Sequence, residues 1–430
     1  MKEINMKELL VKWNVWWEYK KVPENKVLII RGEILKDILK LIKTKEILVL
    51  TGVRRSGKST FIYQTINDLI NNNTNAKNIL YFNFDEPLQD KSTEVLEQVF
   101  TTFLEINNPK GRKYVFFDEI QVINEWERWI KKYYDMYGNE IKFIITGSNS
   151  SMLSSNLLKL LTGRILTKQI FPLFFKEFLN FNQVKIDSMI LQKEEIKHYL
   201  LDYLNKGGFP EVVLENNDDI NNKRLKEYFD GILFRDIVKS KNVREMGKLT
   251  ELAYYTITNI STEFSYNKIS KNIGININSL REYLNYLEEA YLIFQLKYFS
   301  YSLKESIMIQ KPRKIYCIDN GLRNAVSFKF SKDEGKLVEN LVFIELRRKE
   351  LDVYYWKDKY EVDFVIKNKD QSLTAINVSY TNKIDEREIN SLLDFKNKFN
   401  KTKELIVITK DLEKEEQGIQ FIPLWKWLLE

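Results

Sequence analysis

A short glycine-containing motif constrains the fold of this 430-residue chain more than any other feature. Residues 52–59 follow the pattern GxxxxGK[ST], directly after the apolar run ILVL at 47–50 and directly before a helical pattern that begins at Thr60. A strand that leads through such a loop into a helix is the context in which this motif binds phosphate. By average residue usage, chance produces such a string in roughly one or two per cent of chains of this length. The motif therefore predicts a phosphate-binding loop at the carboxyl end of a parallel strand.

The residue types of the loop indicate how it would hold a nucleoside triphosphate, which we take to be ATP, although the motif does not choose between ATP and GTP. Gly52 and Gly57 allow the backbone to curl so that its N–H groups face the phosphates. Lys58 is expected to reach the β and γ phosphates, and the Ser59 hydroxyl to ligate Mg²⁺. Arg54 and Arg55 either face solvent or contact a phosphate. The predicted nucleotide-binding residues are Gly52, Val53, Arg54, Arg55, Ser56, Gly57, Lys58, Ser59, Thr60 and Ser148.

Two carboxylates follow a second apolar run, YVFFDE at 114–119. Asp118 comes after four apolar or aromatic residues, so its side chain is expected at the carboxyl end of a strand, where parallel sheets bind ligands. We assign Asp118 to Mg²⁺ together with Ser59, and Glu119 to orienting and deprotonating the attacking water. The alternative is an acidic pair at a strand end that only faces solvent.

A third apolar run, KFIITGS at 142–148, ends in small polar residues that could contact the γ phosphate, among them Thr146, Ser148 and Asn149. Arg164 follows in LTGRI. We predict that it completes the nucleotide site of a neighbouring subunit, where a cation would stabilise transition-state charge. An arginine paired with a surface carboxylate explains the same position almost as well.

Composition excludes several other classes of protein. The chain is 44% hydrophobic and 30% charged, which is typical of folded proteins. One cysteine and one histidine do not suffice for an internal disulfide or a zinc site of the usual type, and they favour the reducing cytoplasm. No apolar run reaches the roughly 18 residues that cross a bilayer, so no membrane partner is expected. The net charge of +7 leaves DNA open as a partner without requiring it.

Strand and helix patterns alternate from residue 45 to 180, which predicts an α/β fold with a parallel P-loop NTPase sheet and helices on both faces. The expected organisation has five parts. They are an N-terminal lead-in segment (1–44), the AAA-type ATPase domain (45–180), a helical connecting region (181–245), a winged helix-turn-helix (246–310) and a second small α/β domain (311–430).

Short strings along most of the chain carry a resemblance to one family. They include WW at 16–17, GVRRSGKST, FFDEIQ, ITGSNS, LTGR, FPLFFKEFL, GGFPEVV, FRDIV, and GKLVEN followed by EVDFVI. In this order they resemble the prokaryotic AAA-type ATPases with a C-terminal domain of unknown function that has a restriction-endonuclease-like core. The resemblance implies three parts, an ATPase, a winged helix and a nuclease-like domain. It implies little about the biological process.

Within the expected winged helix, residues 277–289 would form the recognition helix. Its buried stripe is predicted to be Ile277, Leu280, Leu284 and Leu287, which leaves Asn278, Arg281, Glu282 and Asn285 outward. Arginine and asparagine side chains suit phosphates and base edges. The neighbouring acidic residues oppose a phosphate backbone. DNA contact and a purely structural role therefore both stay open.

In the C-terminal domain the resemblance assigns Glu339 and Asp363 to the acidic residues of the nuclease core. The next strand of such a core carries Glu-x-Lys, but here Asn377 and Ser379 occupy those two places. An amide binds a hard cation less well than a carboxylate, and serine supplies no positive charge. We therefore expect no DNA cleavage, with Lys357, Lys359 and Lys383 as the lysines that could substitute.

The sequence thus predicts a cytoplasmic, Mg²⁺-dependent ATP hydrolase, with Glu119, Lys58 and Arg164 as catalytic residues. Hydrolysis would drive movement of the helical and winged-helix parts, in a homo-oligomer or on DNA. The rival prediction is an NTP-gated regulatory or binding switch that hydrolyses slowly.

Overall fold

The computed structural model describes residues 5–87, 90–153, 160–241, 243–301, 312–327 and 333–430. The chain forms two compact units, Met1–Ile170 and Phe171–Glu430, which are described separately below. In the described part of the chain, no helix has both the length and the apolar character needed to cross a bilayer.

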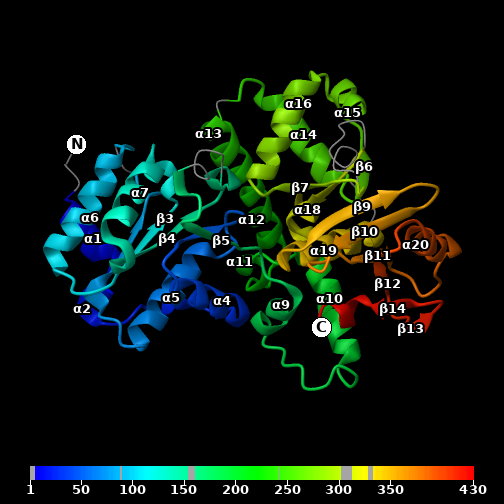
Figure 1. Ribbon diagram of the computed structural model, residues 1–430, viewed down its shortest axis with the longest axis horizontal. Coiled ribbons are helices and arrows are strands. Elements are labelled where there is room, and N and C mark those ends of the chain that lie inside the picture. The colour runs from blue at the N-terminus through cyan, green and yellow to red at the C-terminus, as the bar shows by residue number, and fades with distance from the viewer. Residues whose placement is uncertain (1–4, 88–89, 154–159, 242, 302–311, 328–332) are drawn as a thin grey trace. The chain divides into compact units, whose positions relative to one another are not determined.

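The first unit is built on one parallel sheet with the strand order β2-β3-β4-β1-β5 (Figure 1). Its strands are β1 (Ile47–Thr51), β2 (Ile79–Asn83), β3 (Lys113–Asp118), β4 (Ile141–Gly147) and β5 (Ile165–Gln169). Four of them coincide with the apolar runs of the sequence, so the predicted parallel sheet is confirmed. The fifth, β5, was missed because it is only half-buried and carries Thr167, Lys168 and Gln169.

Among the described residues of this unit, four helices precede the first strand, and three longer ones, α5 to α7, connect strands as a parallel sheet requires. They are α1 (Met6–Trp13), α2 (Trp16–Tyr19), α3 (Glu24–Val27), α4 (Gly32–Ile42), α5 (Lys58–Asn71), α6 (Thr93–Asn107) and α7 (Trp126–Tyr137). Of these, α5, α6 and α7 fall within the predicted alternation of strands and helices from residue 45 to 180.

The segment before β1 covers the edge strand β2. The indole N–H groups of Trp16 and Trp17 both donate to the Ile79 carbonyl, at 3.3 and 2.7 Å. The amide of Asn14 donates to the Tyr81 carbonyl at 2.8 Å and accepts from the Tyr81 N–H at 2.6 Å. These bonds satisfy backbone groups that an open sheet edge would leave unpaired. The tryptophan pair therefore belongs to the first unit as a structural cap.

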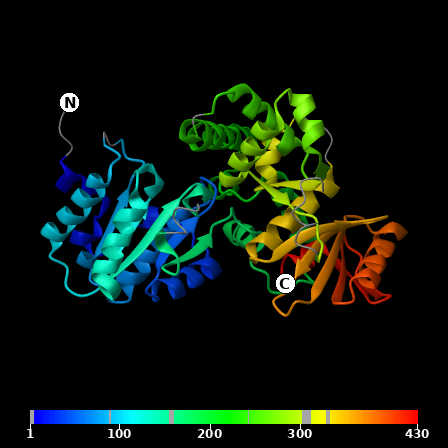
Figure 2. The ribbon, with the colours of Figure 1, turned by 45° about the horizontal axis from the view of Figure 1, so that its top comes forward.

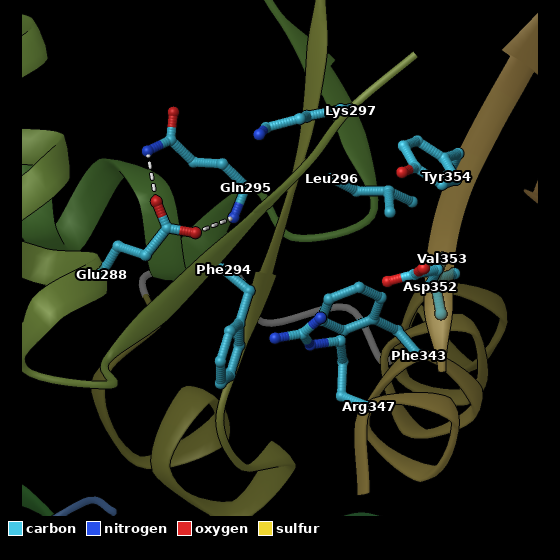
Figure 3. Close-up of a pocket in the computed structure, with 10 residues that line it drawn as sticks. All are labelled: Glu288, Phe294, Gln295, Leu296, Lys297, Phe343, Arg347, Asp352, Val353 and Tyr354. Atoms are coloured by element: carbon cyan, nitrogen blue, oxygen red, sulfur yellow. Dashed lines mark hydrogen bonds between the residues drawn. The ribbon is translucent and has the colours of Figure 1, made fainter. Parts of the chain in front are cut away.

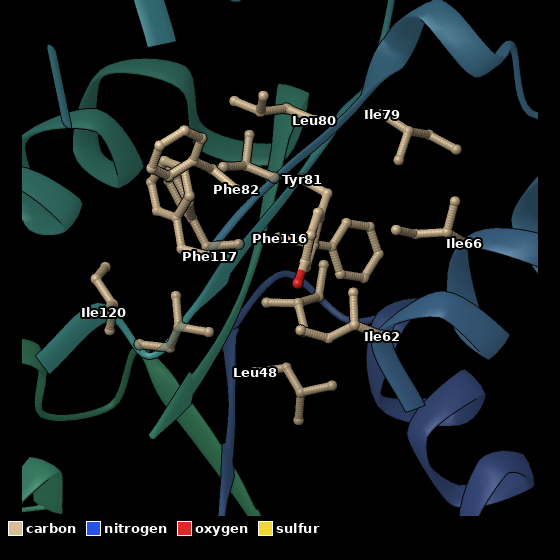
Figure 4. Close-up of a cluster of buried hydrophobic side chains, with 14 of the residues drawn as sticks. Leu48, Ile62, Ile66, Ile79, Leu80, Tyr81, Phe82, Phe116, Phe117 and Ile120 are labelled. Carbon is tan, nitrogen blue, oxygen red and sulfur yellow. The ribbon is translucent and has the colours of Figure 1, made fainter. Parts of the chain in front are cut away.

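The core of the first unit lies between the sheet and its helices (Figure 4). Leu48 of β1, Leu80 of β2 and Phe116 of β3 are almost fully buried, together with Ile62 and Ile66 of α5. Full burial of one such side chain stabilises a fold by roughly 1.5–3 kcal/mol. This packing fixes the sheet edge from which the loops of the site emerge.

The second unit contains a three-stranded sheet in the order β6-β8-β7 and a six-stranded sheet in the order β13-β14-β12-β11-β10-β9. The smaller sheet consists of β6 (Thr262–Phe264), β7 (Ile293–Leu296) and β8 (Arg313–Cys317). The larger consists of β9 (Asp352–Lys357), β10 (Glu361–Lys367), β11 (Leu373–Ser379), β12 (Thr402–Thr409), β13 (Lys414–Glu416) and β14 (Ile419–Pro423). Backbone hydrogen bonds of Tyr355 with Lys297 and Phe299 join the two sheets.

The helices of the second unit surround both sheets. They are α9 (Phe175–Phe181), α10 (Lys193–Lys206), α11 (Pro210–Val213), α12 (Asp218–Gly231), α13 (Lys239–Lys241), α14 (Met246–Thr258), α15 (Tyr266–Ile273), α16 (Ile277–Glu289), α18 (Asn320–Val326), α19 (Glu334–Arg348), α20 (Glu386–Lys398) and α21 (Leu424–Trp427). A π-helical stretch, Ile232–Val238, continues α12. Figure 2 shows α20 beside the strands of the larger sheet, and it packs against β10, β11 and β12.

Candidate functional site

The glycine-containing loop lies where the sequence predicts it, between β1 and α5. Gly52 has a φ of +143°, and a Cβ at this position would lie 2.1 Å from the Ile170 carbonyl oxygen. Gly57 has a φ of +98° and precedes the first residue of α5. Both positions require glycine because L residues rarely adopt these φ values. The loop therefore presents its backbone and the amino end of a 14-residue helix to a ligand.

Lys58 is almost completely buried beneath this loop, with 4% of its surface exposed. Its ammonium donates to the carbonyls of Gly52 and Val53, at 3.0 and 3.1 Å. Nζ lies 3.9 Å from Oε1 of Glu119. The lysine thus faces both the loop and the carboxylate predicted to act as the base.

Asp118 ends β3 and is fully buried. Its carboxylate accepts hydrogen bonds from the hydroxyls of Thr146 and of Tyr81, the latter at 3.0 Å. Burial raises the pKa of Asp118, and the charge of Glu119 raises it further, while hydrogen bonds from Ser59 and Thr146 oppose the shift. Ser59 and Asp118, the two predicted metal ligands, are thus in contact.

Glu119 is held in an unusual backbone conformation directly after the strand. Its φ is +53°, which is uncommon for a residue other than glycine and is often found at functional sites. Its N–H donates to Thr146 Oγ1 at 3.0 Å, and its Oε2 accepts from Gln121 Nε2 at 2.5 Å. Glu119 is buried, with 7% of the surface of the residue exposed. The turn therefore points Glu119 toward Lys58 and fixes it there.

Ser148 follows β4 and is buried at the same sheet edge. The Gln121 amide lies 3.5 Å from its hydroxyl and so connects Ser148 with Glu119. Of the loop arginines, Arg54 donates to Asp85 at 3.1 Å and Arg55 is exposed with a φ of +69°. Ser56 is buried, whereas Ser59 and Thr60 are half-buried at the start of α5.

Arg164 lies at the amino end of the parallel strands, whereas the loop lies at their carboxyl end. Its carbonyl accepts from Ile47 N–H at 2.8 Å, so it aligns with the start of β1, whereas the loop follows the end of that strand. Its guanidinium donates to Asp135 at 3.2 Å on the surface. Within one chain the structure therefore places Arg164 away from Lys58. A role in a neighbouring subunit stays a prediction.

Sequence reasoning missed several contributors to this site. Arg31, 4% exposed, donates to the Ser56 carbonyl at 3.0 Å and lies over the Phe61 ring at 5.2 Å. Gln121 and Tyr81 hold Glu119 and Asp118. Arg31 comes from the lead-in segment, and no local pattern indicates that it reaches the loop. The tyrosine and glutamine look like ordinary strand and turn residues.

The donor set suits Mg²⁺ held jointly with phosphates. The oxygens of Asp118 and Ser59 are hard ligands, which Mg²⁺ prefers. The described residues contain no group of three or more His, Cys, Asp or Glu side chains arranged to hold a metal. Mg²⁺ commonly takes one or two protein ligands and the phosphates of its substrate, so the residues present fit that cation.

A second set of charged groups gathers in the second unit around Lys314 of β8, which is 2% exposed at its side chain. Its ammonium lies 3.0 Å from Glu339 of α19, 2.5 Å from Glu361 and 3.1 Å from Asp363, both on β10. The Tyr316 hydroxyl donates to Glu339 at 2.7 Å. Burial raises the pKa of Glu339 to about 7, although Lys314 opposes the shift. We call Lys314, Glu339, Glu361 and Asp363 the Lys314 cluster.

The structure brings Glu339 and Asp363 together as the sequence predicts, but the cation beside them was not among the three lysines considered. Lys357 instead pairs with Glu361 and Glu263, at 3.2 and 2.8 Å. Lys314 precedes the helix and strands of the predicted core, so the spacing of that core did not indicate it. Packing of β8 against α19, where the Cys317 N–H donates to Asn340 Oδ1 at 2.8 Å, brings it there.

Asn377 and Ser379 lie on β11 beside this cluster. Asn377 is fully buried and accepts from the Asp363 N–H at 3.2 Å. Its amide donates to Glu388 Oε2 at 2.9 Å and to Ser391 Oγ at 2.7 Å. The amide thus links β10, β11 and α20, which is a packing role for a position where a nuclease core carries a carboxylate.

Residues 246–301 and 312–317 include the region predicted to be a winged helix, which stays a prediction. Three helices, α14, α15 and α16, precede or flank the sheet β6-β8-β7, and α16 buries Leu280, Leu284 and Leu287 as predicted. Ile277 is only half-buried, and Tyr283 takes its place in the buried stripe. Arg281 is half-buried, 5.4 Å over the Tyr266 ring.

Comparison with known families divides the chain into three matched stretches. Residues 44–179 match an AAA domain, 197–333 a domain of unknown function, DUF8612, and 334–427 a second one, DUF4143. The first match covers the sheet and the loop described above.

Two relatives align along most of the chain. Uncharacterized protein MJ1544 of Methanocaldococcus jannaschii is 37% identical over 421 residues, which is 92% of this chain and 91% of that protein. An uncharacterized protein of Haemophilus influenzae is 29% identical over 94% of this chain and 100% of its own length. Among solved structures, the Walker-type ATPase PABY2304 of Pyrococcus abyssi is 14% identical, with a TM-score of 0.48, over 71% of this chain and 97% of that one.

Proposed function

Because the chain belongs to the family of MJ1544 and its AAA domain precedes matches to DUF8612 and DUF4143, we propose that it is an Mg²⁺-dependent ATP hydrolase. The observation that carries the proposal is the meeting of Lys58, Asp118 and Glu119 at the carboxyl end of the strands, with the Ser59 hydroxyl close enough to Asp118 to lower its pKa. Mg²⁺, when bound, neutralises charge on the phosphates and on Asp118.

Each residue of the site has a separate role in the proposed hydrolysis. The loop N–H groups and Lys58 bind and orient the phosphates. Glu119 accepts the proton of the attacking water, since its carboxylate lies 3.9 Å from the lysine that would hold the γ phosphate. Gln121 bonds to both Ser148 and Glu119. Ser148 would contact the γ phosphate, and Gln121 would couple that contact to the position of Glu119.

Replacing Glu119 with glutamine tests this assignment. Glutamine keeps the size of the side chain but cannot accept the proton, so turnover should fall by roughly 10²-fold or more. Affinity for ATP should stay near that of the parent, measured with a fluorescent nucleotide beside steady-state hydrolysis. An equal loss of binding would assign Glu119 to structure instead of chemistry.

A slow NTP-gated switch is the second candidate, and one contact favours it. The 2.5 Å hydrogen bond from Gln121 occupies one oxygen of the proposed base. Steady-state hydrolysis with and without DNA separates the two candidates. The switch predicts slow turnover that DNA does not change, whereas a motor on DNA predicts stimulation.

We further propose that subunits assemble so that Arg164 reaches a neighbour's nucleotide. Its half-buried side chain, which pairs with Asp135 at the surface, would allow this. Arg164→Ala subunits mixed with Glu119→Gln subunits should recover activity, because some mixed interfaces join an intact Glu119 to an intact Arg164. Inactive assemblies of confirmed mixed composition would contradict a role in trans.

The proposed winged helix gives DNA a surface on α16, where Asn278, Glu282 and Asn285 are exposed. If it binds DNA, affinity should fall steeply between about 50 and 200 mM salt, because phosphate contacts release counterions. Arg281→Ala should weaken binding further. Measured by fluorescence anisotropy, a flat salt response would favour a winged helix that serves only as structure.

For the C-terminal region we propose a nuclease-like fold that does not cleave DNA. The Lys314 cluster supports this, because an ammonium lies among the carboxylates that a nuclease would use for a metal. Asn377, bonded to α20, supports it as well.

A further inference from the structure

A pocket of about 280 Å³ lies in the second unit between β7 and β9 (Figure 3). Residues of α16, β7, α19 and β9 line it. Next to the pocket, the Tyr355 N–H donates to the Lys297 carbonyl at 3.0 Å, and this bond joins the two segments. Since a water molecule occupies about 30 Å³ in the liquid, the pocket has room for a ligand of roughly ten heavy atoms.

Arg347 contributes a guanidinium to this pocket, and no described residue forms an ion pair with it. Its Nε is buried without a hydrogen-bond partner, and among the described residues no ion pair holds the side chain. Its charge lies 5.9 Å from the Phe294 ring. The next residue contrasts with it, since Arg348 bonds to Glu345 at 2.6 Å and to two backbone carbonyls at 2.8 Å. A half-buried cation without such partners is unfavourable unless a ligand supplies them.

One acidic residue of the lining, Glu288, is already engaged. Glu288 accepts from the backbone N–H of Gln295 at 3.0 Å and from its side-chain amide at 2.8 Å, as Figure 3 shows. Burial raises the pKa of Glu288, although Arg313 and Arg347 oppose the shift. Glu288 therefore sets the position of Gln295 and does not pair with Arg347.

The remaining lining combines apolar walls with a second cation. Phe294, Leu296 and Phe343 are buried, and their side chains form part of the lining. Lys297 is exposed at the rim, where no described carboxylate pairs with its ammonium. Asp352 occupies another part of the rim and is exposed. Binding sites for small molecules typically have such apolar walls and a few polar groups that orient the ligand.

We propose that this pocket binds a small organic oxyanion, a carboxylate or a phosphate carried on an apolar group, with Arg347 as its main contact. A guanidinium binds either anion through two parallel hydrogen bonds. Phe294, Leu296 and Phe343 contact the apolar portion, and Lys297 attracts the charge from the rim. This site is separate from the nucleotide site, because it lies wholly in the second unit.

The test is calorimetric titration of the full chain with benzoate, phenyl phosphate and inorganic phosphate, and with benzyl alcohol as a neutral probe. The Lys58→Ala background excludes binding of phosphates to the loop. Benzoate or phenyl phosphate should bind with a dissociation constant of about 1 mM or lower. Arg347→Met should weaken that binding at least about tenfold, and Arg347→Lys by less, since lysine keeps the charge without the planar fork.

Lys349→Met is the matched control, because Lys349 follows on the same helix end, is exposed and does not line the pocket. It should bind the probes like the parent. Preference for benzoate would identify a carboxylate ligand, and preference for phenyl phosphate a phosphate ligand. Equal binding of benzyl alcohol, equal binding by Arg347→Met with an unchanged thermal midpoint, or binding of none of the probes at about 10 mM would each overturn the proposal.

Discussion

Replacing Lys58 with alanine is expected to abolish nucleotide turnover and to reduce ATP affinity by roughly 10² to 10⁴. The ammonium is the only cation of the loop that the structure buries beneath it, among the described residues. A charge-assisted hydrogen bond contributes roughly 1.5–3 kcal/mol, and Lys58 would form about two of them with the β and γ phosphates. The loss can be measured with a fluorescent ATP analogue and by steady-state hydrolysis.

The contacts of Lys58 in the structure sharpen this expectation. The ammonium already bonds to two loop carbonyls, so the alanine variant loses contacts within the folded protein too. The thermal midpoint must therefore be measured alongside binding. Lys77→Ala, an exposed lysine of the same unit, is the matched control and should bind ATP like the parent. Unchanged affinity and turnover in Lys58→Ala would remove the basis for a nucleotide site.

The parts of the site that could be predicted from the sequence are those coded by adjacent residues. Gly52 to Ser59, and Asp118 with Glu119, each follow a buried strand, so their common sheet edge follows from a parallel arrangement. The residues that orient them come from elsewhere. Arg31 precedes the loop by more than twenty positions, and Tyr81 reaches Asp118 only because β2 pairs with β3.

The same difference between adjacent residues and residues brought together by the fold explains what could be predicted of the second unit. Glu339 and Asp363 lie on an amphipathic helix and an apolar strand, and both could be identified. Lys314 lies in the strand RKIYC, whose charge pattern suggests an exposed end, yet tertiary pairing buries it. Strand pairing is a non-local property, and no local periodicity shows which carboxylates a lysine will meet.

Breaking the Lys314 cluster is expected to have the largest effect on stability. Lys314→Met keeps an apolar stem of similar length but leaves Glu339, Glu361 and Asp363 without their shared cation. Removing one partner from a buried ionic group typically lowers the free energy of unfolding by about 3–5 kcal/mol. Lys357→Met is the matched control, because Lys357 pairs with Glu361 at the surface and such pairs contribute about 0–1 kcal/mol.

The effect of Lys314→Met should also depend on pH, with a sign set by Glu339. Its pKa is raised from 4.5 to about 7 in the folded chain, so the folded state binds the proton more tightly than the unfolded state. The contribution of this carboxyl to stability therefore falls as pH rises from about 4.5 to 7. Without Lys314 the carboxylates repel one another more strongly once ionised, and the variant should lose more stability at pH 8 than at pH 5. Urea unfolding at both values measures this, and a smaller loss at pH 8 would contradict the role of Lys314 as counterion.

The same cluster predicts that the parent chain does not cleave DNA. With Lys314 bonded to Glu339, Glu361 and Asp363, a divalent cation would have to displace a buried ammonium before it could activate water. Linear, nicked and branched DNA should therefore stay intact with Mg²⁺ or Mn²⁺. Asp363→Ala is the control for contaminating nuclease. Cleavage by the parent that this variant abolishes would show that a divalent metal ion displaces the Lys314 ammonium. The ATPase would then act as a motor or gate for a working nuclease.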